Sequence, residues 1–185
     1  ADKVSLNTGA INRPEIIQEA ALQFGSSTVV VSIEAIKKPD GRYEAHTDNG
    51  RQSTGVDALD WAEKAAELGA GEILVTSIDR EGAGQGFDLE LTQMISESVP
   101  IPVIASGGAG QVNHVYDVLA EGKADAVCLA SMLHYDFIDS HDEEDDFSSQ
   151  GNVEYLKSRS NHSKYQGATL PEIKQSLISL GIPCR

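Results

Sequence analysis

The sequence predicts an α/β protein whose strands form a parallel sheet. Short apolar, β-branched runs alternate with amphipathic helical stretches along most of the 185 residues. Regular alternation of strand and helix is the pattern of right-handed βαβ crossovers, which place parallel strands side by side. Hydrophobic residues make up 40% of the chain and aromatic residues only 5%, which favours a core built from aliphatic side chains.

Each expected element has its own signal. The run Val29–Glu34 is continuously apolar up to its polar end, as expected of a strand covered on both faces. Asp57 and Gly69 are a candidate N-cap and C-cap, and Pro171 and Gly181 delimit the last helix. In chain order we expect strands at 3–7, 29–34, 72–79, 102–106 and 126–131, and helices at 14–24, 57–68, 89–97, 112–121 and 170–180.

Two segments interrupt the alternation. Residues 42–55 are polar and contain Asn49-Gly50, which predicts a hairpin inserted after a strand. Residues 139–166 are acidic and serine-rich, and include the block HDEEDD at 141–146. Such blocks are usually solvated, mobile loops. We therefore expect one domain over residues 1–185, with 139–166 as a mobile insertion before the last helix.

Charge and cysteine content exclude several classes of protein. The net charge of -15 argues against nucleic acid as a partner, whereas small phosphorylated molecules remain compatible because backbone amides bind phosphate locally. No signal peptide opens the chain, and no apolar run has the roughly 18 residues that a membrane helix needs. Two cysteines without metal-type spacing indicate a reducing cytoplasm. No HxH, HExxH or CxxC spacing occurs, so we expect neither a metal nor a cofactor.

A glycine-rich stretch, IASGGAG at 104–110, is the strongest binding signal. A buried strand runs into three glycines and then a helix, which lets the backbone approach a ligand and presents N–H groups to an anion. The alternative is a turn that serves only tight packing. The next strand ends at Leu129–Met132, where Ser131 can donate to the same anion. Loops after the last two strands of a β/α barrel commonly build one phosphate site.

A second polar loop, TSIDREGAGQGFD at 76–88, also follows a strand. Barrel enzymes place their binding groups in loops at the carboxyl ends of strands. A purely structural turn would not need Thr76, Ser77, Asp79, Arg80 and Glu81 together, so a binding role is favoured.

Strand alternation separates the candidate site residues from the core. Val29, Val31 and Ile33 should meet the helices, which leaves Ser32 and Glu34 facing the barrel axis. A carboxylate at the catalytic end of a strand makes Glu34 a candidate general acid or base; the alternative is a capping or salt-bridge role. Lys3 and Glu72 both lie at the amino ends of their strands, away from the catalytic end, and are expected to pair across the axis. Stability of the bottom layer is the default role of such a pair.

Six stretches carry a family resemblance: ADKVSLNT (1–8), VVVSIE (29–34), GAGEILVTSIDREG (69–82), GFD (86–88), PVIASGGAG (102–110) and ASMLHY (130–135). Together they resemble the cyclase subunit of imidazole glycerol phosphate synthase. The resemblance covers nearly the whole chain except the acidic insertion. It implies a (β/α)8 TIM barrel, of which this chain would cover roughly strands four to eight, since an ordinary eight-fold barrel takes about 250 residues.

The resemblance also implies a reaction and a partner. That family uses ammonia to convert a phosphoribulosyl aminoimidazole carboxamide ribotide into imidazole glycerol phosphate and an aminoimidazole carboxamide ribotide. A glutaminase partner supplies the ammonia through the axis of the barrel. The chain would then be part of a cytoplasmic lyase of histidine biosynthesis that acts on a phosphorylated small molecule.

Carried over position by position, the resemblance assigns roles to named residues. Asn7 and Thr8 would hold one substrate phosphate. Lys3 and Glu72 would gate ammonia at the barrel bottom, and Asp2 would face the glutaminase. The second phosphate would be held by Gly82, Gly107, Gly108, Ala130 and Ser131. The substrate-binding loops also contain Thr76, Glu81 and Ser106.

The chain departs from the family pattern in ways that bear on activity. The family's aspartate on strand one has no counterpart, and Glu34 and Glu81 each stand where the family has aspartate, which moves the carboxylate by one methylene. We therefore expect little activity from this chain alone. We expect homo-oligomers, because strands 3–7 and 126–131 would be open edges and Val30 and Leu74 would face water. The alternatives are a catalytically silent phosphate-binding half-barrel, a related sugar-phosphate isomerase, and a homologue from polysaccharide biosynthesis.

Overall fold

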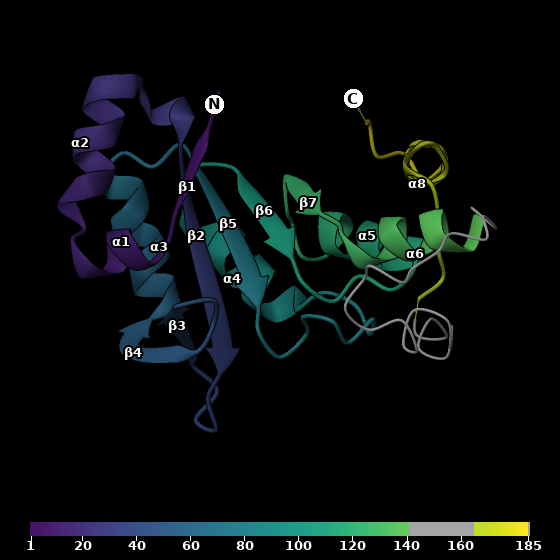
Figure 1. Ribbon diagram of the computed structural model, residues 1–185, viewed down its shortest axis with the longest axis horizontal. Helices are drawn as coiled ribbons and strands as arrows, with labels where there is room; N and C mark the ends of the chain where they lie inside the picture. Colours follow the sequence, from purple (N-terminus) through teal and green to yellow (C-terminus); the bar gives the residue numbers. More distant parts are fainter. Residues whose placement is uncertain (141–164, 185) are drawn as a thin grey trace, which may run out of the picture.

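The computed structural model describes residues 1–140 and 165–184 (Figure 1). The acidic block predicted at 141–146 and most of the predicted insertion at 139–166 lie outside the described residues. None of the helices in the described ranges combines the length and the apolar character needed to cross a bilayer.

The described strands form one sheet in the order β4-β3-β2-β5-β6-β7, with β1 beside β2. The pairs β1–β2, β2–β5, β5–β6 and β6–β7 are parallel, so the predicted parallel sheet is confirmed for these five strands. The strands are β1 Val4–Leu6, β2 Val29–Lys37, β3 Tyr43–Thr47, β4 Gln52–Asp57, β5 Glu72–Ser77, β6 Val103–Ser106 and β7 Ala126–Cys128.

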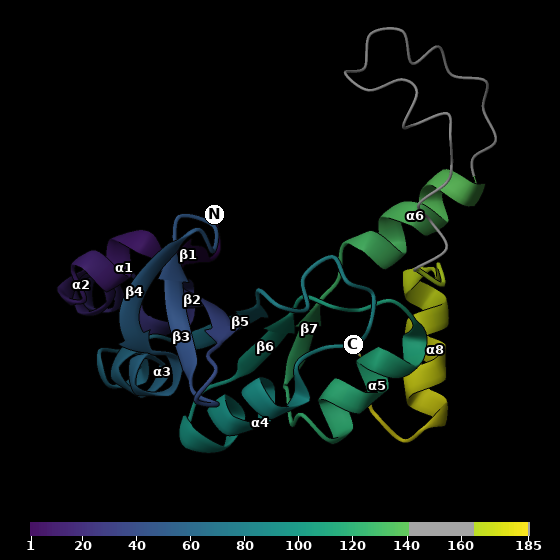
Figure 2. The same ribbon diagram turned by 90° about the horizontal axis from the view of Figure 1, so that it is seen from below.

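Helices follow the strands and lie in an arc around one side of the sheet (Figure 2). The five predicted helices are confirmed as α2, α3, α4, α5 and α8, with ends within one or two residues of those expected. Asp57 caps α3 by accepting from the N–H groups of Leu59 and Asp60. The described helices are α1 Thr8–Asn12, α2 Glu15–Phe24, the 3-10 turn η1 Ser26–Thr28, α3 Ala58–Glu67, α4 Leu89–Ser98, α5 Val112–Ala120, α6 Ser131–Ser140 and α8 Leu170–Ser179.

The last strand is shorter than predicted. β7 ends at Cys128, and Ser131, predicted to close this strand, is the first residue of α6. The amide of His134 donates to the carbonyl of Ala130 at 3.0 Å, which closes the first helical turn. Met132, 1% exposed, is buried beside Ala105 and Val115. The sequence predicted a strand up to Ser131 because a short apolar run fits a strand and a buried helix equally well, and here its last part belongs to a buried helix.

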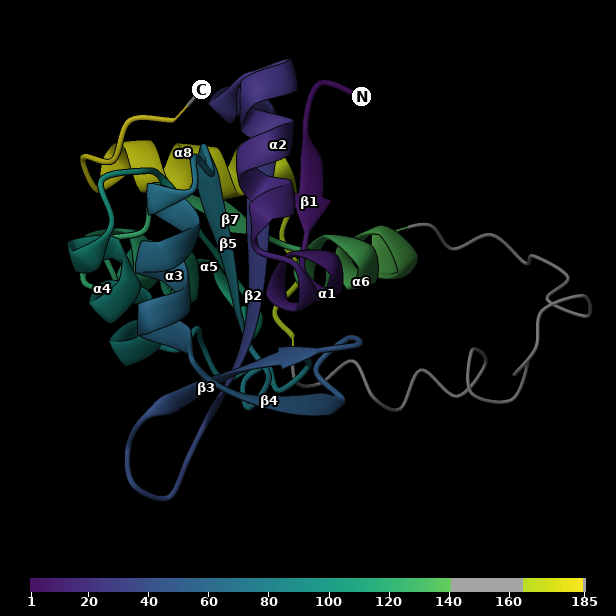
Figure 3. The ribbon, with the colours of Figure 1, turned by 90° about the vertical axis from the view of Figure 1, so that its left-hand side faces the viewer.

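One edge of β2 is shared by two different strands. β1 pairs in parallel with Val29–Val31, and β3 pairs antiparallel with residues 34–37. The hairpin predicted from Asn49-Gly50 is confirmed as β3–β4, but its pairing with β2 was not predicted, so the sheet is mixed. Figure 3 shows the hairpin lying across the carboxyl end of β2.

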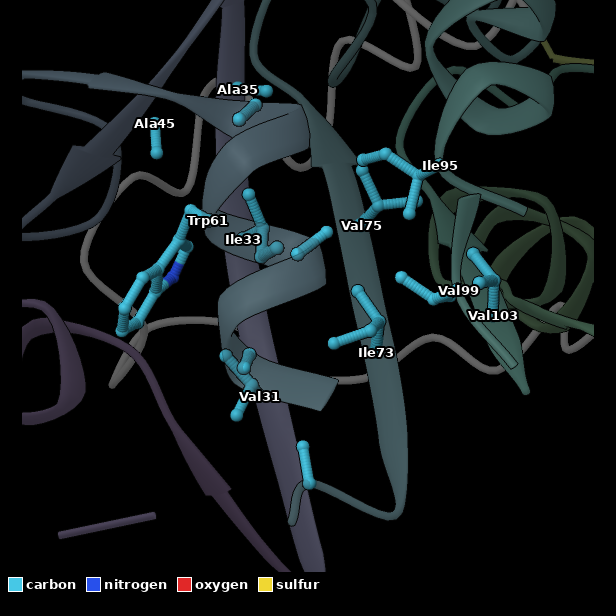
Figure 4. Packing of buried hydrophobic residues seen from close by; sticks show 14 of the residues in the cluster. Val31, Ile33, Ala35, Ala45, Trp61, Ile73, Val75, Ile95, Val99 and Val103 are labelled. Carbon is cyan, nitrogen blue, oxygen red and sulfur yellow. The ribbon is translucent and has the colours of Figure 1, made fainter. Parts of the chain in front are cut away.

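Two buried clusters stabilise the described part of the chain. The first core lies between the central strands and helices α2 to α4; Figure 4 shows Val31 and Ile33 of β2 beside Ile73 and Val75 of β5. The second core joins β6 to α5, α6 and α8, and includes Ala105, Val115, Val118, Met132, Ile173 and Leu177. The sheet is not closed, so the described residues form a partial barrel.

Candidate functional site

Strand register places polar residues in a single row across the sheet. Glu34 pairs with Thr76, Thr76 with Ser106, and Ser106 with Cys128. On the other side of β2, Glu34 pairs with His46 of β3. Residues in register share one face of a sheet. We call these five residues the polar row; it lies near the carboxyl ends of the parallel strands.

Glu34 lies on the face that alternation predicts for it. Val29, Val31 and Ile33 are fully buried in the first core, so the side chain of Glu34 leaves β2 on the opposite face. Its Oε2 atom is buried and has no hydrogen-bond partner among the described residues. The sequence predicted that β2 ends at Glu34, but pairing with β3 extends the strand to Lys37. Its acid–base role stays a prediction.

His46 is a polar-row residue to which the sequence assigned no role. It is 9% exposed, its Nδ1 lies 3.0 Å from the carbonyl oxygen of Gly50, and its buried Nε2 has no partner in the described part of the chain. The missed signal was Pro39-Asp40-Gly41, a tight-turn sequence. This turn sets Lys37 opposite Tyr43, and therefore Glu34 opposite His46.

The side chains of Asn7 and Thr8 tie the end of β1 to its neighbours. The Asn7 amide donates to the carbonyls of Ser32 and His46 at 3.2 and 3.3 Å. The Thr8 hydroxyl donates to Asn7 Oδ1 at 3.2 Å and accepts from the amide of Asp48 at 3.1 Å. Asn7 thus bridges the point where β2 changes partner from β1 to β3. The phosphate-binding role of both residues stays a prediction.

The glycine loop after β6 packs closely on the loop after β5. The amide of Gly86 donates to the carbonyl of Gly108 at 2.8 Å. A Cβ atom on Gly108 would lie 2.2 Å from Gly86 O, and one on Gly110 would lie 2.1 Å from Gly84 O. Close backbone packing therefore accounts for these two glycines without a ligand. Because α5 begins only at Val112, the predicted anion site at Gly107 and Gly108 precedes the helix start and does not coincide with it.

The loops that follow β5 and β7 are joined through two tyrosines. The hydroxyl of Tyr165 donates to the carbonyl of Gly82 at 2.8 Å, and its ring stacks on Tyr135 of α6 with centroids 5.0 Å apart. The predicted phosphate residues Ala130 and Ser131 lie at the beginning of the same helix. The structure thus links the loops carrying these predicted residues, while their role stays a prediction. Glu81 is exposed, and its amide donates to the carbonyl of Ser77 at 3.0 Å.

Lys3 and Glu72 form an ion pair at the amino ends of β1 and β5. Because β2 lies between these strands, the pair crosses one strand and does not span a barrel axis. Ser5, Val30 and Glu72 are in register on this face. Val30 is only 7% exposed, so the expectation that it faces water is wrong, since the ion pair crosses the face on which it lies. The gating role of Lys3 and Glu72 stays a prediction.

A polar network fixes the hairpin beside the polar row. The Glu44 carboxylate pairs with Lys38 at 2.7 Å and accepts from the Ser53 hydroxyl and from the Gly55 amide at 2.8 Å. These contacts, that with Lys38 first, lower the pKa of Glu44 to about 2. The Tyr43 hydroxyl donates to Asp88 Oδ1 at 3.0 Å, and burial, then this contact, raises the pKa of Tyr43.

A surface pocket of about 810 Å³ lies beside these groups, on the helix side of the sheet. It is lined by Lys37, Tyr43, Arg80, Asp88 and His114, among others. Asp79 and Arg80, two loop residues for which the sequence favours a binding role, line it, but none of the residues predicted to hold phosphate and none of the polar row does. The pocket is therefore separate from the predicted phosphate site.

Two comparisons with known proteins bear on these observations. The model of a family described as histidine biosynthesis protein matches residues 1–139. The imidazole glycerol phosphate synthase subunit HisF of Alkaliphilus metalliredigens (strain QYMF) is 53% identical over 135 residues, which are 73% of this chain and 54% of that protein. The chain thus spans about half the length of the curated relative that it matches.

Proposed function

The chain belongs to the histidine biosynthesis protein family, and from this premise we propose that it is part of an imidazole glycerol phosphate synthase cyclase subunit. In this proposal the whole protein uses ammonia to convert a phosphoribulosyl aminoimidazole carboxamide ribotide into imidazole glycerol phosphate. This chain supplies the carboxyl-terminal share of the barrel and binds part of the phosphorylated substrate.

The polar row is the observation that carries the proposal. A cyclisation that moves protons needs titratable and hydrogen-bonding groups side by side at the end of the barrel where substrates bind. Glu34, Thr76 and Ser106 meet this need from three neighbouring strands. The row below them, Ser32, Leu74, Ile104 and Ala126, is mostly apolar. Polar character on this face is thus concentrated at the carboxyl end, with Lys3 and Glu72 at the other end.

We assign Glu34 the role of general acid or base in the proposed reaction. The phosphates would be held by the loops after β5, β6 and β7 and by the start of α1. Lys3 and Glu72 would admit ammonia from a glutaminase subunit. The match covers about half of the relative, so we propose these roles for the whole protein and expect little turnover from this chain by itself.

The proposal also includes a compartment and an assembly. Both Cys128 and Cys184 are free thiols, which supports a reducing cytoplasm. Self-association stays a prediction; it is supported by the exposed apolar side chains of Leu22 and Phe24 on α2 and Ile178 on α8, because exposed apolar side chains favour contact with another chain.

Turnover by the protein from its whole reading frame, with ammonium as nitrogen source, tests this function. The release of aminoimidazole carboxamide ribotide is measured by absorbance for the wild type and for Glu34→Gln. Loss of a general acid or base lowers kcat by about 100-fold or more, and the KM for the phosphorylated ribotide should change little because the phosphate loops are intact. Glu90→Gln, an exposed carboxylate on α4, is the control and should leave both constants unchanged. Normal turnover by Glu34→Gln would exclude the assigned role.

A further inference from the structure

Two neighbouring residues of the polar row each carry a buried acceptor atom that has no partner in the described part of the chain. Glu34 and His46 are directly opposite in the antiparallel pair β2–β3, so their side chains share one face. Oε2 of Glu34 and Nε2 of His46 are both buried and without a hydrogen-bond partner among residues 1–140 and 165–184. Buried polar atoms are rarely left unpaired in native proteins, and those that are call for an explanation.

The hydrogen bond at the other ring nitrogen fixes what His46 can offer. A carbonyl oxygen only accepts, so the 3.0 Å contact between Nδ1 and Gly50 O requires a proton on Nδ1. In the neutral ring, Nε2 then carries a lone pair and is an acceptor. An ionised Glu34 carboxylate is also only an acceptor. The two residues therefore present acceptors to each other and cannot satisfy each other without a further proton.

The surroundings add acceptors and negative charge. Glu44 Oε1 lies 4.0 Å from His46 Nε2, too far for a hydrogen bond. The charge of Lys38, which directly follows β2, is matched by Glu44 at 2.7 Å. The amide group of Asn7 donates to two backbone carbonyls. A group that only donates hydrogen bonds and is neutral or positive is thus the chemical complement of this site.

We propose that Glu34 and His46 together bind a nitrogen group with several N–H bonds, an ammonium ion or a primary ammonium group. One N–H donates to Glu34 Oε2 and another to His46 Nε2. His46 is then a substrate-binding residue of the polar row, and Glu34 holds the nitrogen close to where it exchanges a proton. The binding site is argued from Glu34 and His46 alone, and it rests on the proposed function only for the role of the bound nitrogen, because ammonia is the nitrogen source of that reaction.

Binding of small cations to this chain tests the proposal without any turnover. The probes are ammonium, methylammonium and tetramethylammonium chlorides at equal ionic strength, and the readouts are the ¹⁵N shift of His46 Nε2 and the ¹³C shift of the Glu34 carboxyl. We expect saturable shifts with the first two salts and none with tetramethylammonium, which has no N–H. Tighter binding of ammonium than of methylammonium indicates free ammonia as the natural occupant, and the reverse indicates a primary amine of the substrate.

Two substitutions at one position separate the ring nitrogens. His46→Asn retains a donor for Gly50 O but removes the acceptor at Nε2, so ammonium binding should weaken about tenfold, the loss of one hydrogen bond. His46→Gln places an amide oxygen close to the Nε2 position and should bind within about threefold of the wild type. Glu34→Gln should abolish the saturable shift. His114→Asn, in α5 and outside the polar row, is the matched control and should bind normally.

Several outcomes would overturn the proposal. Equal shifts with tetramethylammonium would mean charge screening alone, and no saturable shift with any salt would mean that water serves the two acceptors. A His46 ring protonated on Nε2 and not on Nδ1 would also exclude it. If ammonium binds as expected while Glu34→Gln turns over normally in the whole protein, the proposed function fails and the binding site stands. If turnover needs Glu34 and ammonium does not bind, the ammonium site is excluded and the proposed function stands.

Discussion

The two cores are built from the same strand-and-helix units but differ in how completely they bury their strands. In the first core, Val29, Val31, Ile33 and Ala35 of β2 are all fully buried. In the second core, β7 exposes Ala126 and Cys128, and Val127 is only half-buried. β2 has strands along both edges, whereas β7 has only β6 beside it in the described residues. A strand's burial therefore depends on its neighbours more than on its own apolar sequence.

The largest effect should come from removing bulk in the first core. Ile33→Ala deletes a fully buried side chain in the middle of β2 and should lower the free energy of unfolding by about 3–4 kcal/mol. Leu177→Ala, in α8 and 4% exposed, should cost about 2 kcal/mol, because the second core has fewer surrounding layers that resist collapse. Urea denaturation monitored by circular dichroism gives both values.

Hydrogen exchange sharpens the same comparison. Leu177→Ala should accelerate amide exchange in α5 and α8 while β2 and β5 keep their protection, because the two cores open separately. Ile33→Ala should accelerate exchange everywhere. Equal loss of protection in both regions after Leu177→Ala would show that the cores form one cooperative unit.

The contact between the two glycine loops should give the next largest effect. Gly108→Ala would place a Cβ atom 2.2 Å from Gly86 O in a backbone with φ of +106°, so it should destabilise by about 2–3 kcal/mol. Gly82→Ala has a φ of +68° but open space around the new atom, and should cost about 1 kcal/mol. Denaturation midpoints measured side by side check this. Equal costs would mean that the close approach of the loops is not constraining.

The smallest effect should be a pH dependence confined to the hairpin. The pKa of Glu44 is lowered to about 2 from its ordinary value of 4.5. Its contribution to stability is therefore fully present above pH 4.5 and is lost as the pH falls toward 2. Glu44→Gln should remove this part of the acid dependence. Urea titrations of both proteins from pH 6 to 2 should converge at low pH, and parallel curves would contradict the assignment.

Local patterns predicted most of the fold but not the contacts between distant segments. The continuous apolar run of β2 and the capping residue Asp57 report on their own elements, so the five predicted helices agree with the structure within one residue at each end. Strand ends agree less well, since β2 runs three residues beyond its predicted end and β7 stops three residues short. Ser131 was misplaced because a short apolar run fits a strand and a buried helix equally well. His46 was missed because its position opposite Glu34 depends on a turn at Asp40-Gly41 and on pairing between strands, which neither segment encodes alone.

The stack of Tyr135 on Tyr165 also has an evolutionary consequence. Two residues thirty positions apart in the sequence are held in contact, with Tyr165 anchored to Gly82. Once both ends of a segment are fixed in this way, each doubling of its length adds only about 0.6 kcal/mol of closure entropy. The closure entropy therefore constrains the number of residues between the two tyrosines only weakly, as long as the stack and its anchor are kept. Homologues that keep the two tyrosines and Gly82 are thus free, on this ground, to differ in the length of the chain between them.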